Sequence, residues 1–443
     1  MRDLTSRLRE IVRRETSRTP PGGTTAPGGL PELTYVPDSV ASASGESAAA
    51  ALGATSLDPG GACLVIEYFY PADRSHGRLS IGSYAPSPAA PIHLFDPTLA
   101  GGSDWWRRVV FFDIETSGLS GGAGTLAFLV GCGWFTDEGF EVRQFFLAAP
   151  SGERPMLDAL ARVFDDASLV VTYNGRTFDV PLMETRWAFH RTEAPTADLP
   201  HFDMLPPARR LWSRRDRAGV PLDEWEGCSL AAIERRVLQF HRVRDVPGFE
   251  IPARYFHFLR SGDASVIEGV LEHNRHDLVS LAAVMARALW LAQEGPDACR
   301  EATEQVGLGR LYARAGDLAA AERAFALAAD AGDVEVRPQA LARLAELLSR
   351  QKRHAEAAAA WQAVLDLGRR SAHLRSPLQR RAAEALAIHH EHRARDLRSA
   401  RRYAESLDGA GSRRQQQEIE KRLARLRRKM LPTGDLRPLK FEG

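Results

Sequence analysis

The stretch RRVVFFDIET at residues 107–116 decides the fold, because an apolar run typical of a buried strand ends there in acidic residues. Two further apolar stretches follow, at 124–135 and 140–148, and the polar sequence TDEG between them indicates a tight turn. Together the three stretches predict a meander of β-strands at the start of a domain.

Helices and strands alternate after this meander. Apolar residues recur at helical spacing in MLDALARVFDDA (156–167) and FDVPLMETRWAFH (178–190), and the short run SLVVTYN (168–174) lies between them as a strand. A long helix around 264–293 ends the domain. This order predicts an α/β fold over residues 103–295, with a mixed sheet flanked by helices.

The chain before this domain divides into three parts. The runs CLVIEYFYP (63–71) and RLSIGSYAP (78–86) predict a β-hairpin that leads into the domain over residues 62–102. Residues 19–61 are rich in Pro, Gly, Ala and Ser, so we expect a disordered, flexible linker that buries too little apolar area to offset chain entropy. Residues 1–18 carry apolar side chains at helical spacing and predict a short amphipathic helix.

The region after Pro296 has a different composition, dominated by Ala, Leu, Arg and Glu. Three helix–turn–helix segments lie between 297 and 430, with turns near Gly316, Arg353 and Arg395. These turns are 37 and 42 residues apart, and the pattern resembles tetratricopeptide repeats, whose period is about 34 residues. We therefore expect an all-α helical array that ends in a basic helix, followed by a tail at 431–443.

Composition and charge limit the classes of protein. Hydrophobic residues make up 44% and charged residues 26% of the chain, which is typical of a soluble globular protein. No apolar run reaches the roughly 18 residues of a membrane span, and the charged N-terminus lacks the pattern of a secretory signal. The sequence predicts a cytoplasmic protein with no membrane contact.

The near-neutral net charge conceals an asymmetry. Residues 297–443 contain 29 Lys and Arg against 20 Asp and Glu, whereas the preceding residues contain 29 against 37. A basic C-terminal part favours a polyanionic partner, although solvated faces of Arg-rich helices are an equally ordinary explanation.

Asp113 and Glu115 are the first candidate functional residues. They stand two positions apart at the end of an apolar strand, so both side chains leave the sheet on the same face. Two anions held so close repel each other unless a cation lies between them. An all-oxygen site of this kind suits Mg²⁺ or Mn²⁺, and two such ions about 4 Å apart can stabilise both the attacking and the leaving oxygen in phosphodiester cleavage.

Two more acids follow in the sequence. Asp179 opens the helix after VVTYNGRTF, where helix capping alone could explain an acid, and Asn174 ends the preceding strand. Asp277 borders the apolar face of the helix in VLEHNRHDLVSLAAVM, at a place where an aspartate is usually a surface residue. Each signal is weak when it stands alone.

The combination is specific. A strand with DxE, then NGxxFD, then a helical Asp preceded by a ring-bearing residue, resembles the three motifs of the DEDD superfamily of RNase H-like 3′→5′ exonucleases. The phrases DIETSGLSGGAGTLAFLVG and HNRHDLVSLAAV are similar to the YprB-like group of predicted exonucleases, over roughly residues 60–295.

This resemblance implies roles for individual residues. Asp113, Glu115 and Asp277 would bind metal directly or through water, and Asp179 would assist them. The superfamily has a Tyr four residues before the last Asp or a His five before it, whereas this chain has His273 at minus four. One helical turn joins His273 to Asp277, which favours His273 as the general base, with His276 as a competitor.

Three more residues are candidates for contacts with nucleic acid. Asn174 and Thr116 follow the two strands that carry the motifs, and Arg176 could hold a phosphate. Surface arginines are common, so an ordinary structural role competes with this interpretation for Arg176.

The expected function is that of a metal-dependent nuclease, a 3′→5′ exonuclease on single-stranded DNA or RNA with two divalent ions. The helical array would dock a protein partner or guide the nucleic acid. Two alternatives stay open: a catalytically silent nucleic-acid-binding or scaffold protein, and an RNase H-like endonuclease. Degradation assays with linear and circular substrates separate the three.

Overall fold

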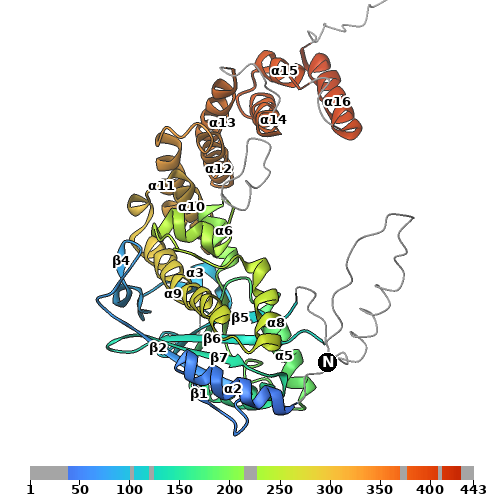
Figure 1. The fold of residues 1–443 in the computed structure, drawn as a ribbon. Coiled ribbons are helices and arrows are strands. Elements are labelled where there is room, and N and C mark those ends of the chain that lie inside the picture. Colours follow the sequence, from blue (N-terminus) through green and yellow to red (C-terminus); the bar gives the residue numbers. More distant parts are fainter. Residues whose placement is uncertain are drawn as a thin grey trace, which may run out of the picture. The chain divides into compact units, whose positions relative to one another are not determined.

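The computed structural model describes residues 38–99, 104–118, 124–213, 227–369, 377–407 and 412–430 (Figure 1). The chain divides into two compact units, residues 1–40 and 41–443, and the first is described only from Asp38 on. The amphipathic helix predicted at 1–18 and the tail at 431–443 lie outside the described residues. Among those described, no helix has the length and apolar character needed to cross a membrane.

A seven-stranded mixed sheet forms the centre of the α/β domain, as the sequence predicts (Figure 1). Its order is β1-β2-β7-β6-β5-β8-β9, in which β5 pairs antiparallel with β6 and parallel with β8. The strands are β1 (Thr55–Ser56), β2 (Cys63–Pro71), β5 (Val109–Thr116), β6 (Ala127–Phe135), β7 (Gly139–Leu147), β8 (Leu169–Thr172) and β9 (His201–Asp203).

Strand β5 is apolar on both faces because each face packs into a different core. Phe111 belongs to the core that includes the C-terminal half of helix α9 (Ser265–Glu294), whereas Phe112 belongs to the core on the opposite face. Side chains alternate along a strand, so Asp113 and Glu115 leave β5 on the same face as Phe111. The apolar run before the acids is continuous because both faces of β5 are buried.

The predicted helices flank this sheet. Helix α4 covers Glu153–Phe164, α5 covers Asp179–Phe189, and α9 corresponds to the long helix expected at 264–293. Shorter helices complete the domain: α3 (Ile92–Phe95), α6 (Leu205–Trp212), α7 (Leu230–Ile233) with a π-helical turn at Glu234–Leu238, and α8 (Ile251–Ser261).

The predicted hairpin at 62–102 is wrong. Strand β2 pairs over its whole length with β7 instead of with residues 78–86, from Cys63 opposite Leu147 to Pro71 opposite Gly139. The residues that follow form only the two-residue strands β3 (Ser75–His76) and β4 (Leu79–Ser80) and a 3₁₀ turn. A nine-residue ladder to β7 satisfies far more backbone groups than a short hairpin does, so β2 joins the main sheet and the domain begins well before residue 103.

The linker predicted at 19–61 is also wrong from Asp38 on, because helix α2 spans Asp38–Leu52. Ala48 is fully buried in the same core as Phe112. A Cβ at Gly45 would lie 2.2 Å from the carbonyl oxygen of Gly61, so small residues let the helix approach the chain closely. The alanine-rich composition that suggests a flexible linker here supplies helix propensity and close packing.

Seven helices form the described C-terminal part: α10 (Ala302–Ala315), α11 (Leu318–Asp330), α12 (Arg337–Arg350), α13 (His354–Arg369), α14 (Pro377–His392), α15 (Leu397–Glu405) and α16 (Arg413–Met430). The three predicted turns fall between α10 and α11, α12 and α13, and α14 and α15 (Figure 1). Gly316 and Arg395 adopt left-handed backbone conformations there, with φ of 88° and 54°. The helical array is as expected, and its assignment to the tetratricopeptide class stays a prediction.

Helix α10 joins the array to the α/β domain through direct packing against α6. A Cβ at Gly307 would lie 2.5 Å from the carbonyl oxygen of Arg210, so only glycine allows this approach. The indole Nε1 of the buried Trp212 donates a hydrogen bond of 2.9 Å to Glu304, which is also buried. The first helix of the array therefore shares the core of the α/β domain.

Candidate metal centre

The end of β5 supplies two carboxylates to the candidate site. Asp113 accepts a 2.8 Å hydrogen bond at Oδ2 from Nδ2 of Asn274 on α9. The ladder between β5 and β6 shifts register between Glu115 and Thr116, where β5 leaves the regular sheet. This irregularity places Glu115 at the edge of the ordered ladder, beside the N-terminal half of α9.

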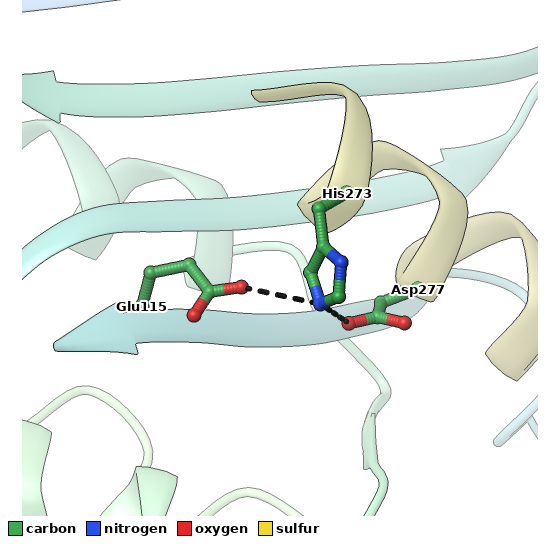
Figure 2. A group of neighbouring side chains, drawn as sticks. All are labelled: Glu115, His273 and Asp277. Carbon is green, nitrogen blue, oxygen red and sulfur yellow. Dashed lines mark ion pairs between the residues drawn. The ribbon is translucent and has the colours of Figure 1, made fainter. Parts of the chain in front are cut away.

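Helix α9 supplies the third carboxylate and a histidine. His273 and Asp277 lie one turn apart, and Nε2 of His273 is 3.4 Å from Oδ2 of Asp277. The same nitrogen lies 3.9 Å from Oε1 of Glu115, so the imidazole stands between the two carboxylates (Figure 2). One potential ligand atom from each of the three residues lies within 4.8 Å of the other two. Segments more than 150 residues apart in sequence thus form one cluster.

Asp179 completes the group from the start of α5. The backbone of Ile114, the residue between Asp113 and Glu115, favours the charged form of the Asp179 carboxylate, whereas the charge of Asp277 disfavours it. Only 8% of the surface of Asp179 is exposed. All four predicted acids therefore converge at the end of β5.

The loop that carries Asp179 has its own support, which the motifs do not reveal. Asp203, at the end of β9, accepts hydrogen bonds from the backbone N–H groups of Asn174 (2.8 Å), Arg176 (3.2 Å) and Leu205 (2.9 Å). Asn174 has a φ of 67°, a left-handed conformation that asparagine tolerates better than most residues. Asp203 thus holds the turn that delivers Asp179 to the cluster.

Burial and mutual repulsion dominate the electrostatics of the acids. Burial, together with the charges of Asp277, Glu115 and Asp179, raises the pKa of Asp113 well above its usual range. Burial also raises the pKa of Glu115 to about 8, against the opposing effect of His273, and that of Asp179 to about 7. These carboxylates lack sufficient positive charge among their neighbours. A hard divalent cation, which prefers oxygen ligands, fits this donor set.

His273 is held from its other side. Its Nδ1 lies 2.7 Å from Oδ1 of Asp245, a residue outside the sequence motifs, so Nε2 is directed toward the cluster. Burial lowers the pKa of His273, but Asp277, Asp245 and Glu115 outweigh burial and raise it to about 9. His276 instead packs edge-on against Phe240, and burial lowers its pKa. The two histidines therefore occupy different environments, and only His273 faces the acids.

Arg242 is the functional neighbour that sequence reasoning missed. Its side chain is 5% exposed, and its guanidinium pairs with Glu234 through Nε at 2.8 Å and also contacts Asp277. Burial opposes the charge of Arg242, yet the two carboxylates raise its pKa above the ordinary value. The segment around it contains two left-handed residues, Gln239 and Arg244, with φ of 56° and 59°. No motif or periodicity marks this arginine, because its partners come from other segments.

The three predicted nucleic-acid contacts are engaged within the protein. Arg176 donates to the carbonyl oxygen of His201 at 2.5 Å and pairs with Asp96 at 3.3 Å. Thr116 donates to the carbonyl oxygen of Gly118, and the side-chain oxygen of Asn174 accepts from Thr177. Contact with nucleic acid stays a prediction for all three, and Arg176 would have to exchange its present partners.

Comparison with known proteins agrees with this geometry. Residues 110–289 match the model of the RNase H superfamily, so the chain carries an RNase H-like domain of a class whose members are usually nucleases with divalent ions. The chain is also similar to the uncharacterized protein YprB of Bacillus subtilis (strain 168), with 29% identity over 380 residues. That similarity covers 83% of this chain and 86% of the relative, and it therefore extends into the helical array.

Proposed function

We propose that this protein is a cytoplasmic metal-dependent nuclease, acting as a 3′→5′ exonuclease on single-stranded DNA or RNA with two divalent ions. The observation that carries the proposal is the convergence of Glu115, His273 and Asp277, with ligand atoms within 4.8 Å of one another. It occurs in an RNase H-like domain, next to two further acids, Asp113 and Asp179.

The carboxylates of Asp113, Glu115, Asp179 and Asp277 would hold Mg²⁺ or Mn²⁺. Bound there, divalent ions would supply an activated water at neutral pH and stabilise the charge that develops on the phosphate oxygens. The protein's own part is to keep the acids together against their repulsion. Helix α9 and strand β5 do this through burial and through the hydrogen bond that Asn274 donates to Asp113.

His273 is proposed to act as the general base. Asp245 engages Nδ1, which leaves Nε2 to exchange protons on the side of the cluster. A pKa of about 9 means that the imidazole is protonated at neutral pH, because Asp277, Asp245 and Glu115 favour its charged form. Divalent cations bound to Asp277 and Glu115 would remove the contributions of these two carboxylates to the raised pKa of His273 and favour a neutral Nε2 that can accept a proton.

The helical array is proposed to bind a protein partner or the nucleic acid. Its sequence region carries 29 Lys and Arg against 20 Asp and Glu, a surplus suited to a phosphate backbone. Since α10 packs directly on α6, a ligand held by the first helices would have a defined position relative to the α/β domain.

Degradation of end-labelled oligonucleotides tests the function. We expect the full chain with Mn²⁺ to shorten linear DNA or RNA of matched sequence and to leave circular single strands intact. Cutting of circles would instead identify an endonuclease. No degradation in Mg²⁺ or Mn²⁺, together with unchanged nucleic-acid binding by Asp113→Ala, would support the silent scaffold.

A further inference from the structure

We propose that Gln144 and Asn274 form a directional amide relay that positions Asp113 as a metal ligand. This inference rests on the proposed metal site and adds two residues outside the four acids. Both side chains are fully buried, and both lie on the face of the sheet that α9 covers.

The relay begins at a backbone carbonyl of α9. Nε2 of Gln144 donates to the carbonyl oxygen of Leu271 at 2.9 Å and to Oδ1 of Asn274 at 2.7 Å. Nδ2 of Asn274 then donates to Oδ2 of Asp113 at 2.8 Å and, more weakly, to its backbone oxygen at 3.4 Å. A chain of donors thus leads from β7 through α9 to the carboxylate on β5.

The direction of each amide follows from the chemistry at both ends. A backbone carbonyl only accepts hydrogen bonds, so Gln144 must turn its amide nitrogen toward Leu271. Nη1 of Arg275, which can only donate, lies 3.4 Å from the amide oxygen of Gln144 and favours the same orientation. The nitrogen of Gln144 then requires the oxygen of Asn274, which leaves the nitrogen of Asn274 facing Asp113.

A glycine makes room for the relay. Asp113 on β5, Gly131 on β6 and Gln144 on β7 stand in one row across the sheet, each opposite the next. A Cβ at Gly131 would lie 2.2 Å from Oδ1 of Asn274 and 2.9 Å from its Nδ2. Because Gly131 has no side chain, the side chain of Asn274 can lie directly over β6. From there it contacts Gln144 on β7 and Asp113 on β5.

The relay would fix the orientation of the Asp113 carboxylate in the metal site. Asn274 engages Oδ2 of Asp113, so the carboxylate cannot rotate freely and its other oxygen is available to an ion. Partners of this kind, hydrogen-bonded to a ligand, commonly change metal affinity about 10- to 100-fold when they are removed. Gln144 does not bond Asp113 in the structure, so we expect its effect on metal binding to pass through Asn274, to which it donates at 2.7 Å.

Mn²⁺ binding to the full chain, measured by titration calorimetry without substrate, tests the relay. We expect Gln144→Met, similar in size but without the donor, to weaken Mn²⁺ binding about tenfold. Asn274→Leu should weaken it at least as much. The matched control is Glu141→Met on the same strand, whose side chain faces the other side of the sheet and bonds Trp134, and it should bind Mn²⁺ as the wild type does.

The double variant provides the sharper result. If Gln144 acts through Asn274, adding Gln144→Met to Asn274→Leu should weaken Mn²⁺ binding no further. Thermal unfolding checks that each variant is folded, and Gln144→Met carries the test if Asn274→Leu is not. Wild-type affinity in Gln144→Met, or independent and additive effects, would overturn the relay alone. Absence of Mn²⁺ binding by the wild type would overturn the metal site and the relay together.

Discussion

Two groups of carboxylates in this protein have opposite electrostatic surroundings. Glu391 on α14 is buried between Nε and Nη2 of Arg425, each 2.7 Å from one of its oxygens, and Nζ of Lys429 at 2.9 Å. The side-chain hydrogen bond from Arg425 is the main cause that lowers the pKa of Glu391 to about 2. The side chain of Glu115 is 15% exposed, and the loss of solvent around it raises its pKa to about 8. Basic side chains fully pair with Glu391, which is typical of a structural ion pair. The carboxylate of Glu115 is not stabilised in this way, which is typical of a site that can bind an external cation.

The largest expected effect is the loss of nuclease activity when a carboxylate of the candidate metal site is replaced. Asp113→Asn keeps the shape of the side chain but removes a proposed metal ligand, so nuclease activity should fall more than about a hundredfold, beyond the range of an outer partner. Burial and the neighbouring carboxylates disfavour the charged form of Asp113, so a neutral amide at this position should not lower the stability of the metal-free protein. Oligonucleotide degradation and thermal unfolding measure the two effects. Asp158→Asn, on the exposed face of α4, is the control that should retain activity. Equal activity of both variants would remove Asp113 from the mechanism.

Replacing Arg242 tests how much the stability of the fold depends on the positive charge beside Glu234 and Asp277. Arg242→Met leaves Glu234, only 1% exposed, without the arginine that pairs with it, and should lower the free energy of unfolding by about 3 kcal/mol. Urea denaturation measures the change. The double variant Arg242→Met with Glu234→Met should recover most of the loss, because apolar residues often replace a buried ion pair without cost. A single variant as stable as the wild type would mean that Arg242 is not needed to hold this part of the site.

Glu391→Gln should weaken the packing of α16 on α14. The two basic partners are 40% and 42% exposed, so the expected loss in free energy of unfolding is moderate, about 1–2 kcal/mol. Chemical denaturation of the full chain gives the value, and degradation of a short oligonucleotide should stay at the wild-type level. Glu356→Gln in the exposed pair with Arg353 is the matched control and should cause no measurable change. A stability loss as large as that of Arg242→Met would contradict the comparison.

The pH dependence of the metal-free protein should show a smaller, graded effect. Glu115 and Asp179 have pKa values raised by burial to about 8 and about 7, so the folded state binds more protons than the unfolded state between about pH 4.5 and 8. Their contribution to stability is present below pH 4.5 and is lost as the pH rises through 7 to 8, by roughly 1.4 kcal/mol per pH unit for each proton released. Saturating Mn²⁺ should flatten this slope. Stability that rises with pH over this range in wild type but not in Glu115→Gln would contradict the assignment.

The sequence alone determined the local features on which the site depends. The apolar run before Asp113 required a buried strand, the spacing of two residues put Glu115 on the same face, and helical periodicity placed His273 one turn from Asp277. These patterns have periods of a few residues, so neighbours along the chain encode them. Polar residues within apolar patterns were also visible, as Gln144 in a buried strand and Asn274 on the packed face of α9, but their partners were not.

Only the tertiary structure decided which distant segments meet. The pairing of β2 with β7, the burial of Ala48 in α2, and the contact of Arg242 with Asp277 all join residues more than 30 positions apart. The relay from Gln144 through Asn274 to Asp113 spans three elements and depends on a glycine on a fourth. Local pattern states which face of an element is buried but not what covers it, because hydrogen bonding and burial can be satisfied by many partners until the whole chain is folded.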